Sequence, residues 1–171
     1  MRHATTQEML IARWTEVIGD PSLRDLPYKI ELNQEGKIEM SPANNWHALA
    51  QGHLAWALKN ALPEGAVLTE CSILTGIGVR VPDVALASKA FLEVQRHSTP
   101  FMQAPEICVE IVSPSNTKRE IDEKVRAYLA AGAKEVRVAS EAGELRFFGA
   151  EGALEASAFG IRTTLPSRND G

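Results

Sequence analysis

The sequence predicts an α/β protein in which a mixed β-sheet is flanked by helices. Three observations support this prediction: stretches with period-two alternation, helical stretches with capping residues, and one almost continuous apolar run between them. Since strands, hairpins and helices follow one another in βαβ-like order, the sheet should contain parallel and antiparallel pairs. The 171 residues fit a single domain over 1–171, and a hydrophobic content of 44 % allows a sizeable core.

The first elements in the chain are a helix and a hairpin. Residues 5–17 have an apolar face and are followed by a Gly-Asp-Pro stop. Residues 28–32 and 37–40 alternate apolar and charged side chains around a polar four-residue turn, which predicts a β-hairpin. Glu31 and Glu39 lie on the charged side of this alternation, so we expect them on a solvated strand face.

A long helix and two further strands follow the hairpin. Asn44 or Asn45 can cap the helix, which should run to about Leu62 before a Pro-Glu-Gly stop. Residues 67–75 and 79–87 are predicted strands, with glycines turning the chain between them.

The last clear elements enclose the apolar run. Residues 106–112 form a strand whose two faces should both be covered, because it is almost continuously apolar. A helix is expected over 117–131, where a glycine can end it. Two strands, 134–139 and 144–148, should then pair around an Ala-Gly turn.

Charge and cysteine content limit the function classes. The net charge of −4 argues against a protein that coats nucleic acid without selectivity, since such domains are usually basic. Cys71 and Cys108 lie in apolar runs without a CxxC partner, so we expect buried free thiols rather than a disulfide or zinc pair. Without an apolar signal segment or a membrane-spanning run, a cytoplasmic protein with no membrane partner is expected.

Two acidic residues stand in unusual positions. Asp83 follows a proline, so the strand should bend or lie at a sheet edge there. Glu110 interrupts the apolar run, where an ionised carboxylate needs a cation, a hydrogen-bond donor or a metal ion beside it. The alternatives are an ordinary Pro-Asp turn and a structural carboxylate paired with Lys124 or Arg126.

Lys124 completes a set that suits phosphodiester hydrolysis. It flanks the apolar stripe of its helix, so its stem can be buried while its ammonium reaches Glu110; a solvated helix lysine is the alternative. Two carboxylates can hold Mg²⁺ or Mn²⁺, and a lysine can position water or stabilise developing charge. We therefore expect Asp83 and Glu110 to converge as metal ligands, with no other cofactor.

Together these residues resemble the PD-(D/E)xK, restriction-endonuclease-like superfamily. Within it, the chain is similar to the Uma-type endonuclease family of bacterial proteins, over roughly residues 8–150. The matching features are the hairpin, a histidine on the long helix, and the sequences VPDV, APEICVEIVSPS and KVRAY. Two departures are visible: Val112 stands where the (D/E)xK motif has lysine, and RVAS at 137–140 replaces a W-x-V-D run that we interpret as structural.

The resemblance implies a restriction-endonuclease-like fold and a Mg²⁺-dependent endonuclease that acts on DNA. It assigns catalytic roles to Asp83, Glu110, Lys124 and His47, with the lysine moved to the following helix and the histidine lining the same cleft. Cleavage of both strands would suit a homodimer. The alternative is a catalytically inactive nuclease-fold module with a structural or nucleic-acid-binding role.

Overall fold

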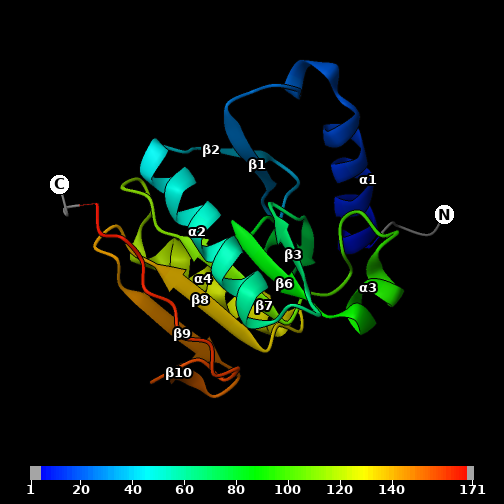
Figure 1. The fold of residues 1–171 in the computed structure, drawn as a ribbon. Coiled ribbons are helices and arrows are strands. Elements are labelled where there is room, and N and C mark those ends of the chain that lie inside the picture. Colours follow the sequence, from blue (N-terminus) through cyan, green and yellow to red (C-terminus); the bar gives the residue numbers. More distant parts are fainter. Residues whose placement is uncertain (1–4, 169–171) are drawn as a thin grey trace.

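The computed structural model describes residues 5–168 and contains, within them, two β-sheets flanked by four α-helices (Figure 1). The helices are α1 (Thr6–Gly19), α2 (Asn45–Ala61), α3 (Lys89–Gln95) and α4 (Lys118–Ala130), with a short 3₁₀ turn at Pro21–Leu23. The predicted mixed α/β class is confirmed, although the strands are divided between two sheets.

The larger sheet has six strands, of which only the central pair is parallel. In spatial order its strands are β10 (Gly152–Leu154), β9 (Leu145–Gly149), β8 (Glu135–Ala139), β7 (Ile107–Ile111), β6 (Val84–Ala87) and β3 (Ala66–Thr69). β7 pairs parallel with β8 through the α4 crossover, and the other pairs are antiparallel.

The smaller sheet carries the predicted hairpin. Its order is β2 (Ile38–Pro42), β1 (Tyr28–Leu32), β5 (Gly78–Arg80) and β4 (Ile73–Thr75), all antiparallel. Leu10, Trp14 and Val17 on α1 pack with Leu32 and Val79 of this sheet, which explains the apolar face of the first helix.

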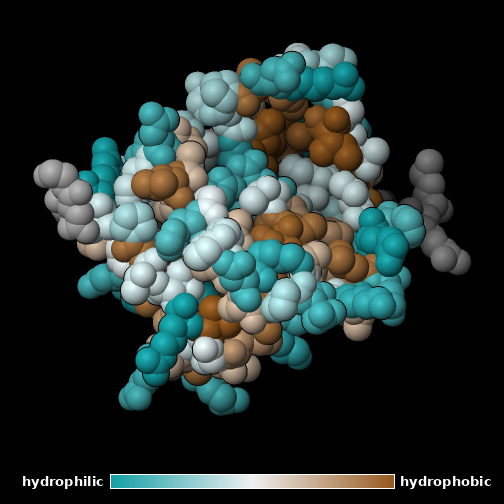
Figure 2. Space-filling model, in the orientation of Figure 1, coloured by the Kyte–Doolittle hydropathy of each residue, from teal (hydrophilic) through white to brown (hydrophobic). Residues whose placement is uncertain are grey.

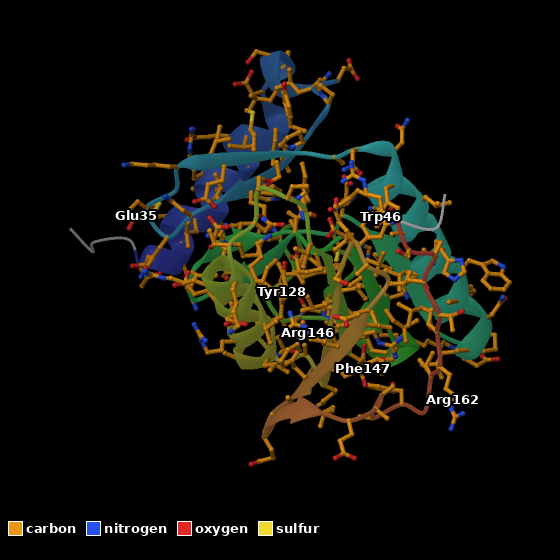
Figure 3. The ribbon with its side chains drawn as sticks, turned by 90° about the vertical axis from the view of Figure 1, so that its left-hand side faces the viewer. Glu35, Trp46, Tyr128, Arg146, Phe147 and Arg162 are labelled. Atoms are coloured by element: carbon orange, nitrogen blue, oxygen red, sulfur yellow. The ribbon has the colours of Figure 1, made fainter. Side chains whose placement is uncertain are left out.

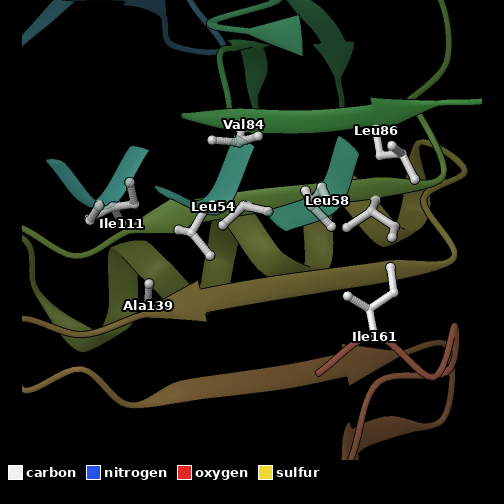
Figure 4. Close-up of a cluster of buried hydrophobic side chains, with 10 residues drawn as sticks. Leu54, Leu58, Val84, Leu86, Ile111, Ala139 and Ile161 are labelled. Atoms are coloured by element: carbon white, nitrogen blue, oxygen red, sulfur yellow. The ribbon is translucent and has the colours of Figure 1, made fainter. Parts of the chain in front are cut away.

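The central strand β7 is covered on both faces, as its apolar sequence predicted. Ile107, Val109 and Ile111 pack with Leu54 and Leu58 of α2 (Figure 4). The alternate residue Cys108 packs instead with the α4 side chains Ile121, Val125 and Tyr128. Because side chains alternate along a strand, Glu110 shares the face of Cys108 and is directed towards α4.

Capping residues set the starts of α2 and α4, and for α2 the cap is one of the two predicted residues. Asn44 caps α2, and its Oδ1 accepts a hydrogen bond of 2.8 Å from the His47 amide. Thr117 and Glu120 form a capping box at the start of α4. These caps fix where His47 and Lys124 lie along their helices.

Two predicted strands are each broken in the middle. The stretch 67–75 divides at Glu70, which has a φ of 58°, and 79–87 divides around Pro82. A left-handed residue and a proline both interrupt a ladder, so the outer halves, β3 and β6, join the large sheet while β4 and β5 join the small one. The break at Pro82 places Asp83 at the junction between the two sheets. The short elements α3 and β10 were not predicted.

Several smaller expectations can also be compared with the structure. Cys71 and Cys108 are free thiols, the second buried and the first half-buried. Within residues 5–168, no helix is both long and apolar enough to cross a membrane. The face in Figure 2 is mostly hydrophilic, with hydrophobic residues gathered in a hollow between α1 and the segment leading to β1.

Candidate active site

A pocket of about 250 Å³ opens where the two sheets meet. Its walls come from the β1–β2 hairpin, the start of α2, the break before β6, the end of β7 and the side of α4. All four residues predicted as catalytic line it: His47, Asp83, Glu110 and Lys124. The geometry therefore brings together side chains from four separate segments of the chain.

Asp83 is fully buried, and both its amide and its carboxylate form hydrogen bonds with the backbone of β7. Its amide donates to the Val109 carbonyl at 2.9 Å, and its Oδ2 accepts from the Ile111 amide at 2.7 Å. Its Oδ1 faces the pocket, where it accepts from Lys29 Nζ at 2.8 Å and lies 3.3 Å from His47 Nε2. The backbone thus fixes one oxygen and leaves the other for the pocket.

Glu110 projects from β7 into the same pocket. Its Oε1 accepts from the Tyr128 hydroxyl at 2.6 Å and from Lys124 Nζ at 3.4 Å, and its Oε2 lies 3.6 Å from Lys29 Nζ. Tyr128, which is labelled in Figure 3, lies on α4 and is fully buried. The Lys29 ammonium lies between the two acids, and both carboxylates contact it.

Lys29 and Glu31 are two site residues that the sequence analysis missed. Glu31 is only 3 % exposed, so the prediction of a solvated strand face is wrong for this residue. Its Oε1 accepts from the Val81 amide at 2.8 Å, and its Oε2 lies 2.9 Å from Lys124 Nζ. Glu39 does stay exposed and pairs with Arg80 at the rim. The signal was the K-x-E spacing on β1, which places both side chains on one strand face.

Burial and opposite charges act against each other on the two pocket acids. Burial alone would raise the pKa of Asp83, but the hydrogen bond with His47 and the Lys29 ammonium outweigh it and hold that pKa at about 2. Glu110 shows the reverse outcome. Its burial, aided by the carboxylates of Asp83 and Glu31, raises its pKa despite the two lysines.

The same neighbouring charges also shift the pKa values of Lys29 and Glu31. Burial would lower the pKa of Lys29, but the three nearby carboxylates raise it above its ordinary value. Burial would raise the pKa of Glu31, and Lys124 and Lys29 instead lower it. Lys29 is therefore firmly charged, and the lysines stabilise the ionised carboxylates beside them.

The donor set suits a hard divalent cation, with one complication. Three carboxylates face two ammonium groups, while Arg80 is shared between Glu31 and Glu39, so negative charge is in excess. Mg²⁺ needs only one or two carboxylates because it keeps several waters. However, no cluster of three or more His, Cys, Asp or Glu side chains suited to a metal occurs within residues 5–168. Asp83 and Glu110 fit such an ion if Lys29 moves aside.

His47 has one ring nitrogen near Asp83 and one without a partner. Its Nε2 is the atom close to the Asp83 carboxylate, whereas its Nδ1 is buried and has no hydrogen-bond partner in the described part of the chain. Gln51, one turn further along α2, donates to the Asp83 carbonyl at 2.8 Å. The start of α2 is thus anchored to the Asp83 segment at two points.

Comparisons with known proteins bear on the family and the fold of the chain. The family model Uma2, described as "Putative restriction endonuclease", matches residues 21–162. A crystal structure of a "putative nuclease belonging to DUF820" from Anabaena variabilis superposes with a TM-score of 0.62 at 16 % identity, over 80 % of this chain and 86 % of that one. No curated protein matches significantly. At this identity the structural likeness shows a shared fold.

Proposed function

Because the chain belongs to the Uma2 family of putative restriction endonucleases, we propose that it hydrolyses DNA phosphodiester bonds in the pocket around Asp83 and Glu110. One observation carries the proposal. Two carboxylates, one directly before β6 and one on the neighbouring strand β7, meet two lysines in a single open pocket. This combination matches a reaction in which a phosphate gains negative charge while water attacks it.

The two carboxylates would hold the metal ion. Asp83 Oδ1 and a Glu110 oxygen are the atoms that face the pocket, and oxygen ligands suit Mg²⁺ or Mn²⁺. When bound, such an ion neutralises charge on the phosphate and lowers the pKa of a coordinated water. Glu110 is held in position by the short hydrogen bond from Tyr128.

The lysines would act on the phosphate. Lys124 is 13 % exposed at its side chain and Lys29 is 12 %, so both reach the pocket while their stems are covered. An ammonium at such a largely desolvated position stabilises negative charge that develops on phosphoryl oxygens more strongly than it would in water. Lys124 is the proposed catalytic lysine, and His47 is proposed to orient Asp83 through its Nε2.

A nuclease assay tests the proposal. Purified protein is incubated with supercoiled, linear duplex and single-stranded DNA in Mg²⁺, Mn²⁺ or EDTA, beside Asp83→Ala. We expect cleavage of at least one form that requires a divalent ion and disappears in the variant. Cleavage of equal rate in EDTA, or equal rate with a folded Asp83→Ala protein, would rule out the proposed site.

A second function has one observation in its favour. Lys29 Nζ lies between Asp83 and Glu110, where it already compensates the charge that an ion would neutralise. This arrangement would suit an inactive nuclease-fold module that keeps the pocket for structure or for binding nucleic acid. A Mn²⁺ titration separates the two proposals: the enzyme binds the ion with a defined stoichiometry that Glu110→Gln abolishes, and the inactive module does not bind it.

A further inference from the structure

A second pocket, of about 290 Å³, adjoins the candidate active site. The two pockets share four lining residues: Pro42, Ala43, His47 and Ser113. His47 is the closest link, since its ring lies 3.3 Å from Asp83 Oδ1 and also lines the second pocket. One ligand can therefore extend from the second pocket to Asp83 in the first.

The walls of the second pocket differ from those of the first. The first pocket contains three acids and two lysines, whereas the second contains no lysine and one acid, Glu141, which pairs with Arg168. Half of the residues that line the second pocket have flat or apolar side chains: Pro42, Ala43, Trp46, Val112 and Pro114. Trp46 lies at the start of α2 (Figure 3) and packs against the hydrophobic core on its inner side, which holds the ring in place. Its indole N–H is buried without an acceptor in the described residues.

We propose that this second pocket binds an unpaired nucleobase next to the scissile phosphate, with Trp46 as the ring on which the base stacks. The inference rests on the proposed function. A base has an apolar face that can stack on the indole and contact the prolines. The second pocket holds the base while the first pocket holds the phosphate attached to it.

The consequence is a preference for unpaired DNA. A base within a duplex is stacked between its neighbours and cannot enter a side pocket unless it is extruded. Single-stranded DNA presents its bases freely, and stacking on an aromatic side chain tolerates any sequence. The substrate class is therefore single-stranded DNA, or duplex DNA with a displaced base near the cut.

A binding experiment isolates the contribution of the base. A fluorescent thymidine oligonucleotide is compared with an abasic oligonucleotide of the same length, in EDTA and at low ionic strength so that neither is cut. Because both chains carry the same phosphate charge, the electrostatic contribution cancels. The protein should bind the thymidine chain roughly tenfold more tightly, given typical stacking on an aromatic ring.

Three variants locate the effect. Trp46→Leu keeps an apolar side chain but removes the ring, so the preference for the thymidine chain should disappear. Trp46→Phe keeps a ring and should retain most of the preference, which guards against a folding defect. Trp56→Leu is the matched control on the same helix, since Trp56 is 64 % exposed and does not line the pocket, and it should leave the preference unchanged.

The outcomes separate this inference from the proposed function. An unchanged preference in a folded Trp46→Leu protein would overturn the base pocket, even if the protein cuts DNA. A preference that depends on Trp46 would support the base pocket, even if no cleavage occurs under any condition. Equal binding of both chains by the unmodified protein would also overturn it.

Discussion

Lys29→Met should reveal whether Asp83 and Glu110 hold a metal ion. The substitution removes the ammonium that lies 2.8 Å from Asp83 and 3.6 Å from Glu110, and leaves two buried carboxylates with one cation fewer. Removing one member of a buried ion pair costs about 3–5 kcal/mol, and the open pocket places this site near the lower end. We therefore expect a loss of roughly 3 kcal/mol, or about 6–12 °C in the thermal midpoint for a chain of this size.

Magnesium should restore most of that loss. An ion that binds only the folded protein at one hundred times its Kd adds about 2.7 kcal/mol. In the unmodified protein the ion must first displace the Lys29 ammonium, so the gain in stability should be clearly smaller. The same metal that replaces the missing charge would thus stabilise the variant more than the parent.

Urea unfolding in EDTA and in excess Mg²⁺ measures both effects. Lys118→Met is the matched control, because the Lys118 side chain is 82 % exposed and pairs with Asp122 in solvent, where such a pair contributes at most about 1 kcal/mol. If Mg²⁺ stabilises Lys29→Met no more than the control, the two carboxylates do not form a metal site and the reasoning fails.

Three further predictions follow from the same contacts. Lys124→Met should abolish cleavage and also lower the urea midpoint, because Glu31 and Glu110 both lose their ammonium partner. Tyr128→Phe removes the 2.6 Å hydrogen bond to buried Glu110 and should destabilise the protein by about 1–3 kcal/mol in the same assay. The depressed pKa of Asp83 contributes stability that is present above pH 3.8 and is lost as the pH falls through about 2. Between pH 5 and pH 2, the free energy of unfolding should therefore decrease by roughly 2 kcal/mol less in Asp83→Asn than in the unmodified protein.

Local sequence patterns were sufficient to predict the site residues that interrupt a regular apolar pattern. Asp83 follows a proline and Glu110 lies inside an apolar strand, and both anomalies are visible in the sequence alone. Lys124 flanks an apolar stripe, and its side chain does reach Glu110. Each of these residues can be recognised from the sequence of a single strand or helix turn, because hydrophobic periodicity and capping patterns extend over that range.

Tertiary contacts decided the rest. The alternation of β1 correctly puts Lys29 and Glu31 on one face, but it does not tell that α4 and β7 cover that face and bury Glu31. The break at Glu70 depends on a left-handed backbone that no glycine marks. At Glu31, contacts with residues distant in sequence override the local preference, as is common for strands.

The most direct test of the central claim is single-turnover cleavage by Glu110→Gln. The substitution keeps the size of the side chain and its place beside Tyr128, but removes the charge that would hold the metal. With saturating Mg²⁺ and a fluorescent single-stranded DNA, the unmodified protein should cut the strand, and folded Glu110→Gln should be slower by roughly a hundredfold or more, since the ion supplies several kcal/mol to such a reaction. Equal cleavage rates for the two proteins would contradict the assignment of this pocket as the active site.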